Sequence, residues 1–458
     1  MTAFRPAAQP SACVQYKVIV AARGRLALAA SYLRGTSRMP LPHETICAWI
    51  DSQRDRLLTL VTEWARISSH SLDPAGLGRM RARLLEDFAP LGRLAGTAAG
   101  RRLVVNAAGD EVAEPVGDLL SLAHRAATGP RVLLAIHYDT VYPADAAPQT
   151  VGLSDDGLIV RGPGVADAKG GLAVLLVALE AFMQWGDCDR LSWEVLLNGD
   201  EELGSPGSAA ALTAAAGRND IGLLFEPTLD EAGTLAGTRK GSANLAVVIR
   251  GRAAHAGRHF SEGRNAVAAA ADLAVAINQL NAEPGETTFN VAAIDGGSAV
   301  NVVPDLAIVR LNIRADTAAA ADWALTQIQT LVATLDHRDG ITARLHGGFH
   351  CPPKPVDDLT QRLLGHIVAC GRSLGLEIAS RSTGGVCDGN KLAAVGLPTI
   401  DTLGVRGGGI HSPAEYLLVE SLVERTKLTA CLLAGLADGS LVWPTAHTRC
   451  PEPERSPS

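Results

Sequence analysis

The chain has 458 residues, too many for one hydrophobic core, and its length predicts two domains. Hydrophobic residues make up 47% and charged residues 19%, which is typical of a globular protein and excludes a disordered chain. The formal net charge is −7 without any basic excess, which argues against a nucleic-acid surface of clustered lysines and arginines.

The eight cysteines are scattered along the chain and form no C-x-x-C pair. This spacing favours neither a disulfide framework nor a zinc knuckle, and a reducing, cytoplasmic location is the simpler expectation. No run reaches the ~18 apolar residues that a membrane span needs. The cysteines are Cys13, Cys47, Cys188, Cys351, Cys370, Cys387, Cys431 and Cys450.

The two ends of the chain differ in composition from the rest. Residues 1–42 form an N-terminal extension that carries basic residues and no acid, as targeting segments do. Arg23 and Arg25 interrupt its apolar stretch, which favours a mis-assigned start over a targeting segment, with the fold beginning after Met39. The Pro-rich end predicts a disordered tail over 441–458.

Hydrophobic periodicity predicts an α/β domain around an inserted segment. Helices are expected at 43–66, 76–91 and 172–183, and buried strands at 132–136, 193–197, 223–225 and 399–403. Strands that alternate with helices predict a mostly parallel sheet with helices on both faces. This catalytic domain would comprise a first part at 43–237 and a second part at 347–440.

The segment 238–346 has a different rhythm, β-α-β-β-α-β, which predicts an inserted ferredoxin-like domain. Its expected strands are 244–250, 287–294, 305–314 and 341–346, and its expected helices are 265–280 and 317–335.

His137 and Asp139 follow the predicted strand 132–136. Open α/β sheets carry ligands at the carboxyl ends of their strands, and residues i and i+2 of an extended chain point the same way. One could bind a metal while the other orients the imidazole. Taken alone, however, a histidine in this position is more often structural.

Asp167 lies in a glycine-rich turn, Gly162 to Gly171, that lacks the GK-Ser/Thr ending of a phosphate loop. A tight turn with a solvated aspartate is an equally good interpretation of this motif alone.

Further acids and a second histidine follow other predicted strands. Glu201 and Glu202 come after 193–197, Glu226 after 223–225, and His411 after 399–403. A surface acidic run is the usual alternative, but carboxylates beside buried strands are costly unless a cation neutralises them. Imidazole mixed with carboxylates suits Zn²⁺, or less often Mn²⁺ or Co²⁺, and a shared carboxylate would give a two-metal site.

In this order, the motifs resemble those of the zinc peptidase and deacylase family of glutamate carboxypeptidase, acetylornithine deacetylase, succinyl-diaminopimelate desuccinylase and aminoacylase, over roughly residues 45 to 435. The resemblance implies two zinc ions, replaceable by Co²⁺ or Mn²⁺, that are bridged by Asp167. One ion would also bind His137 and Glu226, and the other Glu202 and His411.

The same resemblance implies that Glu201 is the general base, which takes a proton from the attacking water and passes it to the leaving nitrogen, and that Asp139 orients His137. The expected reaction is hydrolysis of the amide or peptide bond of an N-acyl amino acid or short peptide that bears a free carboxylate.

The inserted segment resembles the family's lid, which implies a homodimer. His255 would reach the substrate oxyanion of the partner subunit, Asn301 would contact substrate, and Arg314 would grip its carboxylate. Gly384, Gly385 and Asp388 would line the pocket in the main domain. The expected partners are a small-molecule substrate and a second copy of the chain, with neither nucleic acid nor membrane.

Two features limit the expected specificity. No arginine stands near His350–Pro353, where the resemblance would place a second substrate-binding arginine, so glutamate preference is not predicted. Cys387 lacks an evident activating base and is not assigned nucleophilic work. The alternatives are a carbamoyl-amino-acid amidohydrolase, a catalytically silent binding protein and a structural oligomer built on the lid.

Overall fold

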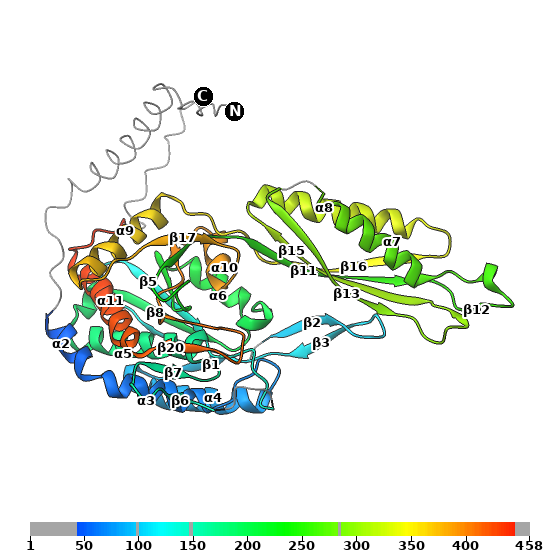
Figure 1. Cartoon of the computed structure of the whole chain (residues 1–458). Helices are drawn as coiled ribbons and strands as arrows, with labels where there is room; N and C mark the ends of the chain where they lie inside the picture. Colours follow the sequence, from blue (N-terminus) through cyan, green and yellow to red (C-terminus); the bar gives the residue numbers. More distant parts are fainter. Residues whose placement is uncertain (1–43, 98–99, 146–149, 283–284, 445–458) are drawn as a thin grey trace, which may run out of the picture. The chain divides into compact units, whose positions relative to one another are not determined.

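The computed structural model describes residues 44–97, 100–145, 150–282 and 285–444 (Figure 1). The predicted N-terminal extension and the part of the predicted tail from 445 onward lie outside the described residues. Within the described part, Leu441 and Trp443 are buried against the main core, so the packed fold extends beyond the predicted boundary at 440.

A six-stranded mixed sheet forms the centre of the main domain, in the order β1-β4-β8-β5-β9-β18. The four strands from β8 to β18 are parallel, and β4 and β1 are antiparallel at one edge. The strands are β1 (Ala95–Thr97), β4 (Leu119–His124), β5 (Arg131–His137), β8 (Ser192–Asn198), β9 (Ile221–Leu224) and β18 (Thr399–Ile400).

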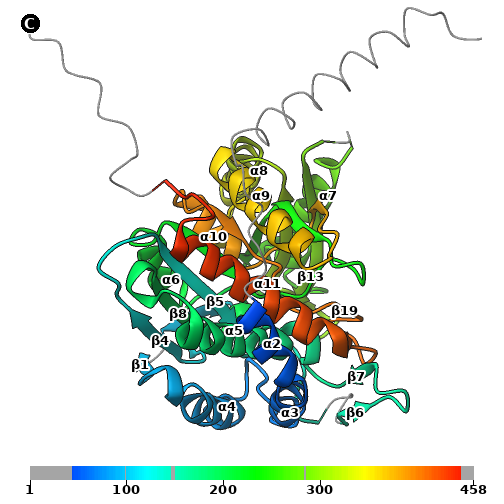
Figure 2. The ribbon, with the colours of Figure 1, turned by 90° about the vertical axis from the view of Figure 1, so that its left-hand side faces the viewer.

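Helices cover both faces of this sheet (Figure 2). Along β5, Val132 and Leu134 join one core, whereas Leu133 and Ala135 join the other. Burial on both sides explains the continuous apolar run of this strand. The first core includes α2 (Glu44–Ser52), α3 (Arg54–Ala65), α4 (Pro74–Asp87), α5 (Gly171–Trp185), α9 (Asp358–Ser373) and α11 (Val419–Asp438), and the second includes α6 (Ala209–Ala216) and α10 (Asp388–Ala394).

The predicted helix 43–66 is two helices, α2 and α3, which are separated at Gln53. Gln53 has φ −91° and ψ 4°, outside the helical region. Both helices bury apolar residues in the same core, and this shared burial produced the continuous helical period in the sequence.

The inserted segment has its strands and helices in the order β-α-β-β-α-β. Its antiparallel sheet has the order β13-β15-β11-β16, and two helices bury their apolar residues against it. The elements are β11 (Gly241–Arg250), α7 (Ala266–Gln279), β13 (Thr287–Gly296), β15 (Leu306–Ala315), α8 (Ala318–Asp336) and β16 (Thr342–Cys351). Strand β16 therefore continues past the predicted boundary at 346.

Shorter strands connect or flank these units, and sequence periodicity did not predict them. They pair as β2 (Arg101–Val105) with β3 (Glu111–Pro115), β10 (Leu235–Arg239) with β17 (Ser380–Thr383), and β12 (Ala254–His255) with β14 (Val302–Val303); a small sheet joins β6 (Gly152–Leu153), β7 (Ile159–Arg161), β19 (Gly407–Gly408) and β20 (Tyr416–Leu418).

In the part of the chain that the structure describes, no helix is long and apolar enough to cross a membrane.

Candidate metal centre

Two groups of acidic and histidine side chains meet beyond the carboxyl ends of β5, β8 and β9. His137, Asp167 and Glu226 form one group, and Asp167, Glu202 and His411 form the other. Within each group, ligand atoms lie within 4.8 Å of one another. The two groups share Asp167, so the five residues that were predicted from the sequence to bind metal lie together around one carboxylate.

The two oxygens of Asp167 face different imidazoles. Oδ1 lies 3.1 Å from Nε2 of His137, and Oδ2 lies 3.1 Å from Nε2 of His411. A second carboxylate lies near each imidazole nitrogen: Glu226 at 3.5 Å from His137, and Glu202 at 3.4 Å from His411. Each imidazole nitrogen is thus directed at two carboxylates, as it would be in a shared cation site.

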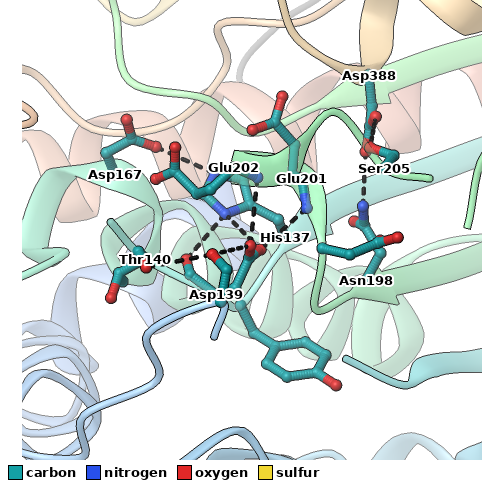
Figure 3. A network of polar contacts seen from close by, with 12 residues as sticks. His137, Asp139, Thr140, Asp167, Asn198, Glu201, Glu202, Ser205 and Asp388 are labelled. Atoms are coloured by element: carbon teal, nitrogen blue, oxygen red, sulfur yellow. Dashed lines mark hydrogen bonds and ion pairs between the residues drawn. The ribbon is translucent and has the colours of Figure 1, made fainter. Parts of the chain in front are cut away.

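Asp139 connects His137 to the acidic turn (Figure 3). The Asp139 carboxylate lies 3.3 Å from Nδ1 of His137 and accepts hydrogen bonds from the backbone N–H groups of Glu201 and Glu202, at 3.2 Å each. It also accepts the Ser71 hydroxyl at 2.7 Å and is fully buried. One carboxylate therefore orients the imidazole and fixes the turn that carries both glutamates.

Glu415 holds the loop that presents Asp167. Its buried carboxylate accepts the backbone N–H groups of Gly164, Ala166 and Asp167, at 3.1, 2.9 and 3.0 Å. Glu415 lies four residues after His411, and the sequence predicted no role for it. The available signal was its place within the same glycine-rich motif.

The carboxylates of the centre are held close together in a dry environment. Burial, reinforced by Glu226, raises the pKa of Glu201 well above its usual range, and burial with Asp167 raises the pKa of Glu202 to about 7. Hydrogen bonds with Asp167 and Glu202 raise the pKa of His411 to about 11. These opposite charges stabilise one another, but the clustered acids still exceed the histidines in number.

Two buried oxygens indicate that the donor set fits a cation. Oε1 of Glu202 and Oε1 of Glu226 have no hydrogen-bond partner among the described residues. An unsatisfied buried carboxylate oxygen is costly, and a divalent cation satisfies it. Imidazole nitrogens mixed with carboxylate oxygens are ligands that suit zinc and neighbouring divalent metals.

A buried polar layer lies behind the acidic turn. Asp388 accepts hydrogen bonds from Ser205, from Asn198 at 2.8 Å and from Lys391 at 2.9 Å. Figure 3 shows Asp388, Ser205 and Asn198 as one chain of contacts beside Glu201. Asp388 was predicted to line the pocket, but its contacts behind the acidic turn were not predicted from the sequence.

The candidate residues of the inserted segment fall into two places. His255 and Asn301 are exposed and lie close together, because β12 pairs with β14 and the Ala256 N–H donates to the Asn301 carbonyl at 2.9 Å. Neither belongs to the two ligand groups in the described part of the chain. Arg314 instead donates to the Gly384 carbonyl at 3.4 Å, next to Gly385.

A buried ionic cluster that the sequence analysis missed joins the two chain crossings between the main sheet and the inserted segment. Arg239 ends β10, Lys354 follows β16, and their backbones pair by two hydrogen bonds of 3.0 Å. Asp401 accepts two hydrogen bonds from Arg239 and one from Lys354, each 2.8 Å. The Asp401 carbonyl also accepts the Glu226 N–H at 3.1 Å, so this cluster adjoins the metal centre.

The sequence model of the family described as peptidase family M20/M25/M40 matches residues 133–435. Over 332 residues the chain is 31% identical to carboxypeptidase G2 of Pseudomonas sp. (strain RS-16), covering 71% of this chain and 78% of the relative. Over 347 residues it is 28% identical to succinyl-diaminopimelate desuccinylase of Maricaulis maris (strain MCS10), covering 70% and 85%.

The fold is similar to the crystal structure of an M20 family metallo-carboxypeptidase from Sulfolobus solfataricus, with a TM-score of 0.64, 16% identity, and coverage of 83% of this chain and 99% of that one. The chain belongs to peptidase family M20/M25/M40. It is a metal-dependent hydrolase of amide or peptide bonds.

Proposed function

We propose that the protein is a di-zinc hydrolase that cleaves the amide or peptide bond next to a free carboxylate, in an N-acyl amino acid or a short peptide. The main support for this proposal is that Asp167 belongs to both ligand groups. Its two oxygens face the separate imidazoles of His137 and His411, and each imidazole has a further carboxylate, Glu226 or Glu202, at its side.

His137, Asp167 and Glu226 would hold one metal ion, and Asp167, Glu202 and His411 the other. When bound, two divalent cations supply Lewis acidity that activates water and polarises the substrate carbonyl. The oxygens Oε1 of Glu202 and Oε1 of Glu226 support this ligand set, because both are buried carboxylate oxygens without a hydrogen-bond partner among the described residues.

Glu201 would move the proton. It is not needed in either ligand group, and Asp139 fixes the position of its backbone. Burial favours the protonated form of its carboxyl, so Glu201 can accept a proton from the attacking water and then release it to the leaving nitrogen. Such a positioned acid–base group contributes roughly 10²- to 10⁴-fold to the rate.

Arg314 would bind the substrate carboxylate. Its Nε bonds to Asn312 at 3.0 Å and one Nη to the Gly384 carbonyl at 3.4 Å, which aims the guanidinium at the Gly384–Gly385 loop. A guanidinium matches a carboxylate through two parallel hydrogen bonds. Relatives named for carboxypeptidase and desuccinylase activities support substrates of this kind.

The inserted segment would act as a lid and as the contact in a homodimer. His255 and Asn301 form an exposed pair on β12 and the loop before β14, and neither belongs to the two ligand groups of the described residues. A pair with this exposure would serve the partner's active site, where His255 would donate to the oxyanion and Asn301 would contact substrate.

The first test measures amine release from a panel of N-acyl amino acids and dipeptides with the zinc-loaded protein. Glu201→Gln should keep both metal ions but lose about 10²-fold or more of the rate, because the amide cannot accept a proton. Glu377→Gln, which changes an exposed glutamate, is the matched control and should behave like the wild type.

Unchanged turnover in Glu201→Gln would remove this residue from the chemistry. A wild-type protein that holds two zinc ions but releases no amine from any carboxylate substrate would contradict the proposed substrate class. Zinc at one ion per chain under saturating conditions would contradict the shared Asp167.

A further inference from the structure

Two thiols from opposite ends of the described chain meet where the first and the last described helices pack together. Cys47 lies on α2 and Cys431 on α11, 384 positions apart, and their Sγ atoms are separated by 3.7 Å. Figure 2 shows α2 beside α11, and the two helices are in contact. Since a disulfide bond is about 2.05 Å long, side-chain movements of less than ~2 Å in total would bring the sulfurs to bonding distance.

The helices are held in register around these thiols. Asp51, one turn after Cys47, forms an ion pair of 2.6 Å with Lys427, one turn before Cys431. Cys47 is half-buried, whereas Cys431 is only 4% exposed. An external reagent can therefore reach Cys47 first, and Cys431 is positioned behind it.

Among the described thiols for which a shift is resolved, Cys47 is the one whose pKa is lowered. The hydrogen bond between Cys47 and Cys431 lowers the pKa of Cys47 to about 7, against the effect of burial and with help from Lys427. Burial instead raises the pKa of Cys188, Cys351 and Cys370. Because the thiolate is the nucleophile in disulfide exchange, oxidation should begin at Cys47.

We propose that Cys47 and Cys431 form a redox-active dithiol that a low-molecular-weight disulfide, such as oxidised glutathione, converts into an intramolecular disulfide. The Cys47 thiolate attacks the glutathione disulfide, forms a mixed disulfide and releases one glutathione thiolate. The Cys431 sulfur, after losing its proton to solvent, attacks the sulfur of Cys47 and releases the second. Two protein thiols are oxidised, and one glutathione disulfide is reduced to two thiols.

The bond would join the first described helix to the last. It would close a loop that contains almost the whole fold, and long closed loops constrain the unfolded chain most. Neither cysteine belongs to the metal centre. Oxidation should therefore change resistance to unfolding and leave hydrolysis unchanged, and the site stands or falls independently of the proposed substrate and metal.

The test uses the full-length, zinc-loaded protein equilibrated with oxidised or reduced glutathione. Free thiols are then alkylated, and the digested protein is mapped by mass spectrometry. We expect a peptide that links Cys47 to Cys431 after oxidation and its loss after reduction. The melting temperature should rise by about 5 °C on oxidation and return on reduction.

Cys47→Ser should abolish both the linked peptide and the shift in melting temperature. Cys188→Ser is the matched control, since Cys188 is also half-buried but its thiol bonds to the backbone carbonyls of Phe182 and Met183, and it should retain both. Three results would overturn the proposal: a glutathione adduct on Cys47 that never resolves, full alkylation of both thiols after oxidation, or an equal shift in Cys47→Ser. Even if a variant folds poorly, peptide mapping of the oxidised wild-type protein shows whether Cys47 and Cys431 are linked.

Discussion

The main-domain centre and the exposed pair of the inserted segment are built in opposite ways. Asp167 is held by three backbone contacts from its loop to Glu415, and Asp139 fixes both His137 and the acidic turn. His255, in contrast, is exposed, and its Nδ1 accepts a hydrogen bond from the Gly257 N–H. The comparison teaches that the proposed metal ligands are held in place by contacts within one chain, whereas the exposed side chain of His255 lacks comparable support among the described residues.

The largest effect should come from removing the shared carboxylate. Asp167→Ala takes one ligand from each group, so we expect loss of both zinc ions and a decrease in kcat/KM of at least ~10⁴-fold. Metal analysis after gel filtration, together with the rate on the best substrate, measures both.

A second variant, Glu415→Gln, tests the support of Asp167 rather than the ligand itself. It keeps every ligand but weakens the support of the Asp167 loop, and it should lower zinc affinity by roughly 10- to 100-fold. Full zinc occupancy in Asp167→Ala would show that the two groups do not share a ligand.

A smaller effect is expected for Arg314, which lies on β15 of the inserted segment and bonds to Gly384 of the main domain. Arg314→Ala should raise KM for substrates with a free carboxylate by about 30-fold, or about 2 kcal/mol, because a bidentate contact is lost. Arg314→Lys should recover only part of this, since an ammonium lacks the planar fork. An equal change in KM on amidated substrates would place Arg314 outside carboxylate recognition.

The last effect concerns stability rather than activity, at His350, which lies on β16 next to Gly204 of the acidic turn. Burial, with Lys391 and Arg314, lowers the pKa of His350 to about 4. Between the unfolded pKa near 6.5 and the folded value, the unfolded chain binds a proton that the folded protein does not. Stability should therefore fall by about 2 kcal/mol as the pH falls through this window, after allowance for partial exposure.

Melting curves of the zinc-loaded wild type and His350→Gln from pH 7 to 4.5 measure this contribution. The variant should have the flatter pH dependence, because glutamine does not titrate. Parallel curves for the two proteins would show that His350 does not carry the effect.

The parts that could be predicted from the sequence share a local signal. The buried strands β5, β8 and β9 are apolar runs that end in acids or histidine, so their position at one sheet edge follows from parallel pairing. The inserted segment likewise has its own periodicity, from which its order of strands and helices could be predicted. Asp167 and His411 were recognised through their glycine-rich motifs and the family resemblance, and not from their spacing alone.

The remaining features depend on contacts between distant segments. Asp401 meets Arg239 across 162 positions, and Cys47 meets Cys431 across 384, so neither contact leaves a periodic trace in the sequence. The break at Gln53 was missed because α2 and α3 bury residues in the same core, which keeps the apolar period continuous. The burial of Trp443 was missed because the composition around it is typical of a tail.

The ion cluster at Arg239, Lys354 and Asp401 has a mechanical consequence. The chain crosses between the main sheet and the inserted segment at Arg239 and again before Lys354, and one carboxylate holds both side chains. The two crossings are therefore linked through one carboxylate, and we expect a movement of one crossing to be transmitted to the other. Because the Asp401 carbonyl also accepts the Glu226 N–H, this link continues to a proposed metal ligand.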